Sequence, residues 1–301
     1  MSHALPLDMM LLDMNFHTKP GWTGYSFDRN LFPFPATTMA QLKSRGLRLA
    51  VNLHDADGVA ATEDSHAAMV TALGLDPATN TTIPFSVCNS SAVSFALEDT
   101  VIARLQRQGV DLTWVDWQQG GQKGGCAGDD HNPRLGISHL RVTSRERRSE
   151  TARPAVLARW GGLGSHRYPV GFSGDVAGLT WANLAFQPFF SFTASNVMYA
   201  WSHDLLGPAN DPELTVRWLQ FGALSSIFRL HDRGLSAGEC VRDAFPTPPD
   251  VRSGCGLVDV WRLPAQHLAA ARVAMQGRAA LVPYLYSAMR ETFDSGVQVS
   301  G

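Results

Sequence analysis

Cysteine is scarce in this sequence and follows no recognisable spacing. Only four are present, and they are spread along the chain: Cys88, Cys126, Cys240 and Cys255. None of them belongs to a CxxC pair or to another metal-type spacing, so the sequence offers no cysteine-based metal motif. We expect free thiols in a reducing compartment, although Cys240 and Cys255 flank one loop and could pair in an oxidising one.

Long apolar runs and an excess of one charge are also missing. No apolar segment approaches the ~20 residues that span a bilayer. The N-terminus lacks a basic start and a small-residue cleavage site, so we expect neither a membrane span nor a signal peptide, and a cytoplasmic location by default. The formal net charge is −2, which gives no general attraction to nucleic acid or anionic membrane. The arginine-rich segment 145–153 also holds glutamates and indicates a solvated helix face.

What the sequence does contain is a repeated pattern of strand, polar residue, loop and helix. The 301 residues are 45% hydrophobic, enough for a full core in one large domain or two smaller ones. Apolar runs end in polar residues at seven places: Asp13, His54, Asp116, Arg159, Asp175, Asp204 and His231. Such alternation predicts a parallel sheet, and a polar tip on every strand favours an α/β fold of the (β/α)8 TIM-barrel type. Seven strands leave this barrel one strand short.

The expected boundaries follow from apolar periodicity and from glycine and proline positions. Strands are predicted at residues 7–12, 47–53, 110–116, 155–158, 168–172, 196–201 and 227–230. Helices are predicted at residues 36–45, 64–73, 92–108, 134–151, 181–191, 211–225 and 264–289.

The most informative stretch is Val110–Gly120, VDLTWVDWQQG. An apolar run rises to Asp116, which stands between Trp114 and Trp117. Indole faces suit the apolar faces of a pyranose, and an apolar wall strengthens the attraction between a carboxylate and a cationic transition state. This pattern favours the nucleophile of a sugar-cleaving enzyme. The ordinary alternative is a strand whose last polar residue caps the next turn.

Four motifs in order extend this interpretation: WVDWQQG, ARWGGLGSHRYPVGFSGD, WSHDLLG and FRLH. Together they resemble the catalytic barrel of glycoside hydrolase family 31, the α-glucosidase and α-xylosidase group of retaining exo-glycosidases. The resemblance runs from about residue 5 to about residue 290. It implies that Asp116 is the nucleophile and that Asp175 is the acid/base. A retaining mechanism requires their carboxyl groups roughly 5–5.5 Å apart.

The resemblance also implies a set of substrate-binding residues. Three polar side chains match positions that hydrogen-bond the sugar at the cleavage point: Asp13, Arg159 and His231. Three aromatic side chains would form an apolar wall: Trp114, Trp117 and Phe172. Asp204 would orient Arg159 or His231. Each polar residue has a structural alternative: a helix cap for Asp13, neutralisation of a buried carboxylate for Arg159, a core histidine for His231 and a pair with His203 for Asp204.

Other polar residues receive structural or open interpretations. Loop packing is expected of His166 and Arg167, and turn chemistry before Gly58 is expected of His54, Asp55 and Asp57. Possible aglycone-side contacts are His17, Trp22 and Tyr25. Two departures from the family pattern concern the substrate: Gln118-Gln119 follows the Asp116-Trp117 pair, and Asn15 stands where an acidic residue is common.

The sequence therefore predicts one catalytic domain over residues 1–301, without the family's first barrel strand and helix and without its N-terminal and C-terminal β-domains. The first functional hypothesis is a cofactor-independent retaining α-glycosidase acting on a terminal α-glucoside, with a carbohydrate as its partner. A second is a catalytically inactive barrel remnant that keeps a sugar-binding pocket. A third is a metal-dependent hydrolase with ligands among His54, Asp55, His203, Asp204, His231 and Asp232. The sugar, the linkage and the oligomeric state stay open.

Overall fold

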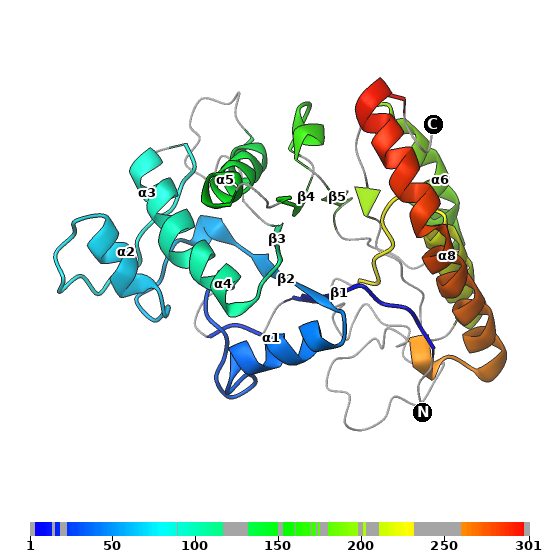
Figure 1. The fold of residues 1–301 in the computed structure, drawn as a ribbon, viewed down its shortest axis with the longest axis horizontal. Coiled ribbons are helices and arrows are strands. Elements are labelled where there is room, and N and C mark those ends of the chain that lie inside the picture. Colours follow the sequence, from blue (N-terminus) through cyan, green and yellow to red (C-terminus); the bar gives the residue numbers. More distant parts are fainter. Residues whose placement is uncertain are drawn as a thin grey trace. The chain divides into compact units, whose positions relative to one another are not determined.

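The chain was analysed as a computed structural model (Figure 1). The structure describes residues 4–13, 16–18, 23–88, 90–116, 132–149, 153–159, 161–168, 170–172, 174, 180–197, 201–202, 211–231 and 260–297. The chain divides into two compact units, Leu7–Pro169 and Met1–Pro6 with Val170–Gly301. Whether residues 1–301 act as one catalytic domain stays a prediction.

The unit Leu7–Pro169 is built on four parallel strands that neighbour one another in chain order. Their bounds are β1 Met9–Leu12, β2 Arg48–Leu53, β3 Leu112–Val115 and β4 Val156–Arg159. Parallel neighbours require a crossover connection, and helices supply it here, as the alternating pattern predicted. Four predicted strands are thereby confirmed, each shortened or shifted by one or two residues at its ends.

The helices of this unit are α1 Pro35–Ser44, α2 His66–Ala72, α3 Ser91–Ala96, α4 Ala103–Gln108 and α5 Pro133–Arg148. A π-helical turn, η2 Leu97–Ile102, joins α3 to α4, so the predicted helix 92–108 is continuous. Asn132 caps α5 by accepting a hydrogen bond from the backbone N–H of Arg134, and Pro133 occupies the first turn. Gly109 ends α4 at φ 113°, where a Cβ would collide with Met39.

Side chains of the four strands alternate between two faces. The register places Leu53, Val115 and Ala158 on one face, where they pack with Met39 of α1 and Ile137 of α5 in the main core. The opposite face therefore carries the alternate residues. At the carboxyl ends of the strands these are polar: Asp13, Asn52, His54, Asp116 and Arg159.

A buried ionic network anchors the turn that follows β2. This turn is η1 Asp55–Asp57. The Asp55 carboxylate accepts a hydrogen bond from Tyr25 Oη at 2.6 Å and one from Arg141 Nη2 at 2.5 Å. Arg141 of α5 also pairs with Glu98 in the π-helical turn. All four side chains are almost fully buried, so the network fixes the backbone beside His54. The burial of Tyr25 contradicts its possible contact with an aglycone.

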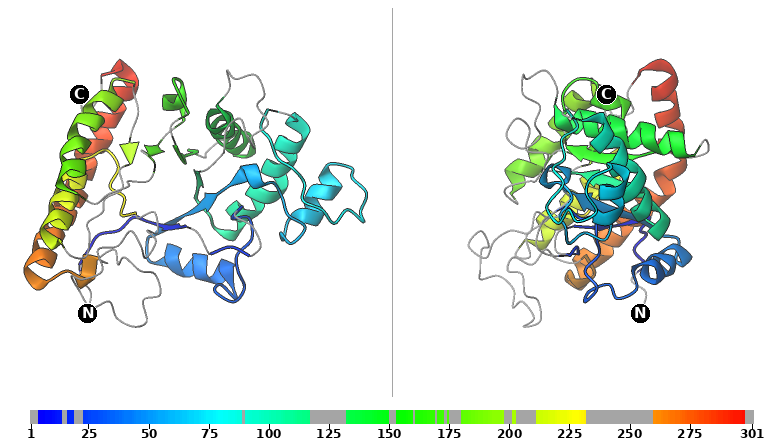
Figure 2. Two further views of the ribbon diagram at one scale, coloured as in Figure 1. Left: turned by 180° about the vertical axis from the view of Figure 1, so that it is seen from behind. Right: turned by 90° about the vertical axis from the view of Figure 1, so that its left-hand side faces the viewer.

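The described residues of the second unit form two short strands and three long helices: β5 Gly171–Phe172, β6 Trp201–Ser202, α6 Trp181–Ser195, α7 Pro212–Ala223 and α8 Ala265–Ser295. β5 and β6 are parallel neighbours. α7 packs on α8 and on α6, as Figures 1 and 2 show. Trp218 of α7 is fully buried against Leu184 of α6, and Leu219 packs with Met275 of α8.

Several boundaries in this unit were predicted wrongly, and two of them have a visible reason. The expected strand 227–230 is reduced to a single bridge residue, Ile227. A side-chain contact holds this segment: buried Arg229 lies over the Phe172 ring, 4.9 Å from its centroid. α8 continues six residues past the predicted residue 289, because Arg290 pairs with Asp294 at 2.6 Å and Gly296 provides a left-handed C-cap at φ 75°.

The structure also bears on two further expectations, free cysteine thiols and the absence of a membrane span. Cys88 is disulfide-bonded, so the expectation of free thiols is wrong for this residue; its partner lies outside the described residues. This bond removes the basis for predicting a reducing compartment. In the described part of the chain, no helix has both the length and the apolar composition to cross a membrane.

Candidate active site

Asp116 lies directly after β3, at the carboxyl edge of the four-stranded sheet, and its side chain is buried. Three residues surround its carboxylate. Arg159 Nε donates a hydrogen bond to Oδ1, and Asn52 Nδ2 donates one to Oδ2 at 3.0 Å. His54 Nε2 approaches Oδ2 at 3.7 Å. The sheet register explains this arrangement, because His54, Asp116 and Arg159 are level with one another on neighbouring strands.

Asn52 also reaches a second carboxylate. Its Nδ2 donates to Asp13 Oδ1 at 2.6 Å, in addition to Asp116 Oδ2. One amide nitrogen of β2 thus bridges two carboxylates that follow the strands on either side of it, β1 and β3. Asn52 Oδ1 is buried and has no hydrogen-bond partner among the described residues. An unmatched buried acceptor costs about 1–3 kcal/mol, so this is an unfavourable arrangement for a residue that serves stability alone.

The charge state of Asp116 follows from these contacts. Burial by itself would raise the pKa of the carboxyl group. The nearby His54 ring, hydrogen bonds from Arg159 and Asn52 and the positive charge of Arg159 outweigh burial, and they lower the pKa from 3.8 to about 2. Asp116 is therefore a buried carboxylate that is ionised throughout the neutral range.

A second arginine contributes to the electrostatics of this edge. Arg134 stands in the first turn of α5, and burial together with the positive charge of Arg159 lowers its pKa, while the charge of Asp116 acts in the opposite direction. Two guanidinium groups, from β4 and α5, therefore balance the carboxylates here. Arg134 does not end a strand, so the pattern of polar strand ends did not select it.

Trp114 belongs to the same face of the sheet as Asp116, two residues earlier on β3. It pairs in register with Asn52 on one side and Leu157 on the other. Only 1% of its surface is exposed. The indole thus packs beneath the polar edge, and its predicted role as a sugar-facing wall stays a prediction.

Two predicted site residues lie in the other unit. Phe172 ends β5 and is fully buried, with Arg229 over its ring. His231 follows the segment 227–230 and is partly buried. Three further predicted residues lie outside the described part of the chain: Trp117, Asp175 and Asp204. The separation between the carboxyl groups of Asp116 and Asp175 therefore stays a prediction.

The metal-site interpretation gains no support from the described residues. Nowhere among them do three or more histidine, cysteine, aspartate or glutamate side chains gather closely enough to hold a metal ion. His54 faces Asp116 rather than a second histidine. Three of its proposed companions, His203, Asp204 and Asp232, lie outside the described residues.

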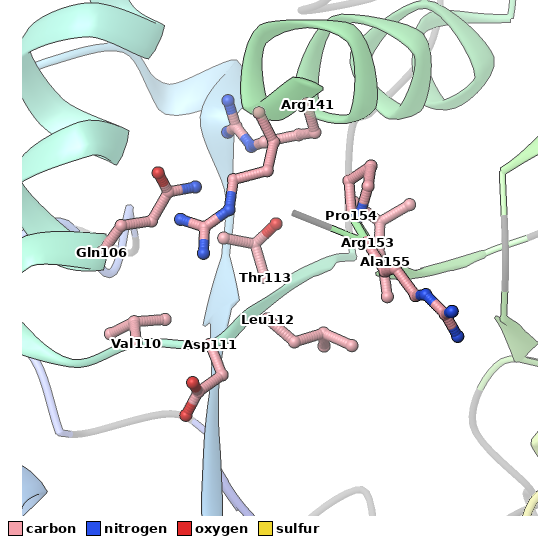
Figure 3. A pocket seen from close by; sticks show the side chains of 11 residues that line it. Gln106, Val110, Asp111, Leu112, Thr113, Arg141, Arg153, Pro154 and Ala155 are labelled. Carbon is pink, nitrogen blue, oxygen red and sulfur yellow. The ribbon is translucent and has the colours of Figure 1, made fainter. Parts of the chain in front are cut away.

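The opposite edge of the sheet carries a hollow of about 390 Å³ that includes open solvent (Figure 3). It lies at the amino ends of β3 and β4, between Gln106, Thr113 and Arg153. None of the predicted catalytic or sugar-binding residues lines it. In (β/α)8 enzymes the reaction takes place at the carboxyl edge, so we assign the candidate site to the edge that carries Asp116.

Comparison with known proteins shows which family the chain belongs to. The family model described as the glycosyl hydrolases family 31 TIM-barrel domain matches residues 1–288. The chain belongs to glycoside hydrolase family 31. This membership confirms the predicted TIM-barrel fold class.

Curated family 31 relatives are much longer than this chain. An α-xylosidase from Saccharolobus solfataricus is 25% identical over 323 aligned residues, which cover 98% of this chain and 40% of the relative. The human neutral α-glucosidase AB is 27% identical over 158 residues, covering 52% of this chain and 15% of the relative. The chain thus spans well under half of the curated relatives that it matches.

Solved family 31 structures share the fold. A dextranase variant from Flavobacterium johnsoniae, complexed with isomaltotriose, superposes with a TM-score of 0.74 at 18% identity, covering 99% of this chain and 38% of the dextranase. An α-xylosidase from a soil metagenome, complexed with xylose, gives a TM-score of 0.69 at 19% identity, covering 99% and 47%.

The structure thus brings together Asp13, Asp116 and Arg159, three of the predicted site residues. It adds Asn52, Arg134 and His54, of which His54 had been assigned to turn chemistry. Strand alternation could have found Asn52, because it stands two residues before His54 on an otherwise apolar strand and therefore points to the same face. The contact between Arg134 and this edge depends on how α5 packs, which sequence periodicity does not specify.

Proposed function

We propose that this chain is the catalytic barrel of a retaining α-glycosidase that hydrolyses a terminal α-glycosidic bond, with an α-glucoside as substrate. The observation that carries the proposal is Asp116: a buried carboxylate at the carboxyl edge of the sheet, held ionised by Arg159, Asn52 and His54 in a family 31 chain. A nucleophile must be ionised at the working pH, and a pKa of about 2 meets this requirement.

The proposed reaction is a double displacement. An Asp116 oxygen attacks the anomeric carbon while the bond to the leaving oxygen breaks, and Asp175 donates its proton to that oxygen. In the second step a water attacks the same carbon, gives a proton to Asp175 and releases Asp116 as a carboxylate. Asp175 must hold a proton at the start, so its pKa must be higher than that of Asp116.

Arg159 and Asp13 have distinct proposed roles. Arg159 holds one oxygen of Asp116 and compensates its charge, so the carboxylate stays in one orientation for attack. Asp13 is partly exposed at the same edge and supplies an acceptor for a sugar hydroxyl. Trp114, Trp117, Phe172, Asp204 and His231 are proposed to complete the sugar-binding site.

An assay of the purified chain on matched chromogenic α-glucoside and α-xyloside substrates tests the proposal. Turnover of the α-glucoside that is lost in Asp116→Ala and retained in EDTA supports a retaining α-glycosidase. Preference for the xyloside would correct the sugar but keep the mechanism. A folded chain without turnover of any α-glycoside would favour the inactive remnant, and loss of turnover in EDTA would favour the metal-dependent hydrolase.

A further inference from the structure

The bridge formed by Asn52 suggests a role beyond packing. Its amide nitrogen donates to Asp13 Oδ1 at 2.6 Å and to Asp116 Oδ2 at 3.0 Å, so one side chain contacts both carboxylates of the edge. Two carboxylates that share one neighbour repel each other, and such repulsion favours protonation of one of them. A donor placed between them reduces this repulsion, since each N–H stabilises the charged form of one carboxylate.

We propose that Asn52 is a positioning residue that holds the Asp13 and Asp116 carboxylates side by side. The proposal rests on the proposed function, in which Asp116 is the nucleophile and Asp13 binds a sugar hydroxyl. Asn52 fixes Oδ2 of the nucleophile while Arg159 fixes Oδ1, so the carboxylate plane is held at both oxygens.

The orientation of the Asn52 amide is set by its neighbours. The reversed amide would point its carbonyl oxygen at two carboxylate oxygens, which repel it. With the nitrogen facing the carboxylates, Oδ1 is left buried without a partner among the described residues. The chain keeps this unfavourable acceptor in order to keep the two donor contacts, and violations of this kind concentrate at functional sites.

The backbone of Asn52 is held as firmly as its side chain. The loop after residue 22 packs on it: the backbone N–H of His54 donates to the Thr23 carbonyl at 3.1 Å. Gly24 stands at φ 78°, where a Cβ would collide with the Asn52 carbonyl oxygen. The central position in the sheet, between β1 and β3, adds ladder bonds on both sides. A positioning residue requires such a fixed base.

Among the described residues, four other charged or titratable groups lie at this edge: Asp13 after β1, His54 after β2, Arg159 of β4 and Arg134 of α5. Substitution of Asn52 leaves all four in place. A change in the titration of Asp116 in an Asn52 variant therefore reports the lost bridge itself.

The test compares Asn52→Leu with Thr113→Val in the full chain. Thr113 is a buried polar residue of the adjacent strand at the opposite edge, so its loss controls for general destabilisation. In Asn52→Leu we expect a roughly 10- to 100-fold loss of kcat/KM, because the nucleophile is less firmly oriented. The acid limb of kcat/KM against pH should rise by about one pH unit, because a charge-assisted hydrogen bond is lost. Thr113→Val should leave both unchanged.

Asn52→Asp keeps the shape of the side chain and serves if the leucine variant does not fold. This substitution places three carboxylates together. As the pH falls, the new carboxyl group takes up a proton that it can donate to its neighbours. The activity of the variant relative to the unsubstituted chain should therefore rise as the pH falls. If the activity of Asn52→Asp relative to the unsubstituted chain did not depend on pH, the proposal would be contradicted. The same holds if the acid limb of Asn52→Leu coincides with that of the unsubstituted chain or of Thr113→Val.

A titration of the aspartate carboxyl carbons by ¹³C NMR, in the unsubstituted chain and Asn52→Leu, separates this proposal from the proposed function. The Asp116 signal, assigned by comparison with Asp116→Asn, should titrate at higher pH in the variant whether or not the chain turns over substrate. No turnover together with this change would overturn only the proposed function. Turnover without this change would overturn only the role of Asn52.

Discussion

The two ends of strand β3 carry one aspartate each, and the two residues have opposite surroundings. Asp111, before the strand, accepts from the backbone N–H of Leu49 at 3.0 Å and pairs with Lys43 at 3.4 Å and Arg48 at 3.2 Å, whose side chains are well exposed. Asp116, after the strand, is buried among Arg159, Asn52 and His54, with a second carboxylate near by.

The difference shows that the two edges of one sheet treat charge in opposite ways. At the amino edge each charge has solvent or a flexible partner, so exchange of one residue disturbs little. At the carboxyl edge the charges are fixed by buried donors, like charges are neighbours, and one acceptor is unmatched. Arrangements of the second kind are costly unless function maintains them. Four pairs of variants test this contrast.

The largest effect is expected from the same substitution at the two ends of β3. Asp116→Asn should reduce kcat for an α-glucoside by at least ~10⁴-fold, because the amide cannot attack the anomeric carbon. Asp111→Asn should leave kcat within about twofold and lower the free energy of unfolding by at most ~1 kcal/mol. Steady-state kinetics and urea unfolding of both variants test this contrast, and an equal loss of kcat in the two would abolish it.

The next effect concerns buried and exposed arginines of one helix. Arg141→Met removes the buried cation that the Asp55 and Glu98 carboxylates share and should lower the free energy of unfolding by ~3–5 kcal/mol. The matched change Arg147→Met removes an exposed pair with Asp99 and should cost at most ~1 kcal/mol. Urea denaturation measures both. Similar costs would mean that the Asp55 network does not anchor the turn beside His54.

A third comparison places the same change at opposite edges. Arg159→Leu should lower kcat/KM by roughly 10²–10³-fold, because a preorganised positive group beside the nucleophile is lost. It should also raise the acid limb of the pH profile, since the charge of Arg159 lowers the pKa of Asp116. Arg48→Leu, at the amino edge, should change neither. An unchanged acid limb in Arg159→Leu would contradict the ionic contact.

The smallest effect is a pH dependence of stability. The pKa of Asp116 is depressed from 3.8 to about 2 in the folded chain. Its stabilising contribution is therefore present above pH ~4 and is lost as the pH falls toward 2. The difference in unfolding free energy between the unsubstituted chain and Asp116→Asn should shrink by ~1.5 kcal/mol between pH 5 and pH 2.5. The corresponding difference for Asp111→Asn serves as the control.

The sequence predicted the alternation of strands and helices well, because apolar periodicity and turn residues are local signals. It identified Asp13, Asp116 and Arg159 from their places at strand ends, and the structure brings all three to one edge. Strand length was harder to predict. Of the expected strand 227–230, only Ile227 forms a bridge in the described chain, and Arg229 packs on Phe172 there. Local sequence does not encode that long-range contact.

The contacts that define the charge state of the site were also beyond the sequence. His54 was assigned to the turn before Gly58, and Asn52 received no role. The contacts of Asn52 and His54 with Asp116 depend on the register between β2 and β3. This register places Asn52 level with Trp114 and His54 level with Asp116. Register is set by packing of the whole sheet against its helices, so it emerges only in the folded unit.

Trapping of the glycosyl-enzyme tests the proposed role of Asp116 most directly. The chain is incubated with a slow-turnover fluorinated α-glucosyl fluoride, digested and mapped by mass spectrometry. We predict one sugar adduct per chain, on the peptide that contains Asp116, and no adduct in Asp116→Asn. A stoichiometric adduct on another carboxylate of an active chain, or turnover that inverts the anomeric configuration, would show that Asp116 is not the nucleophile.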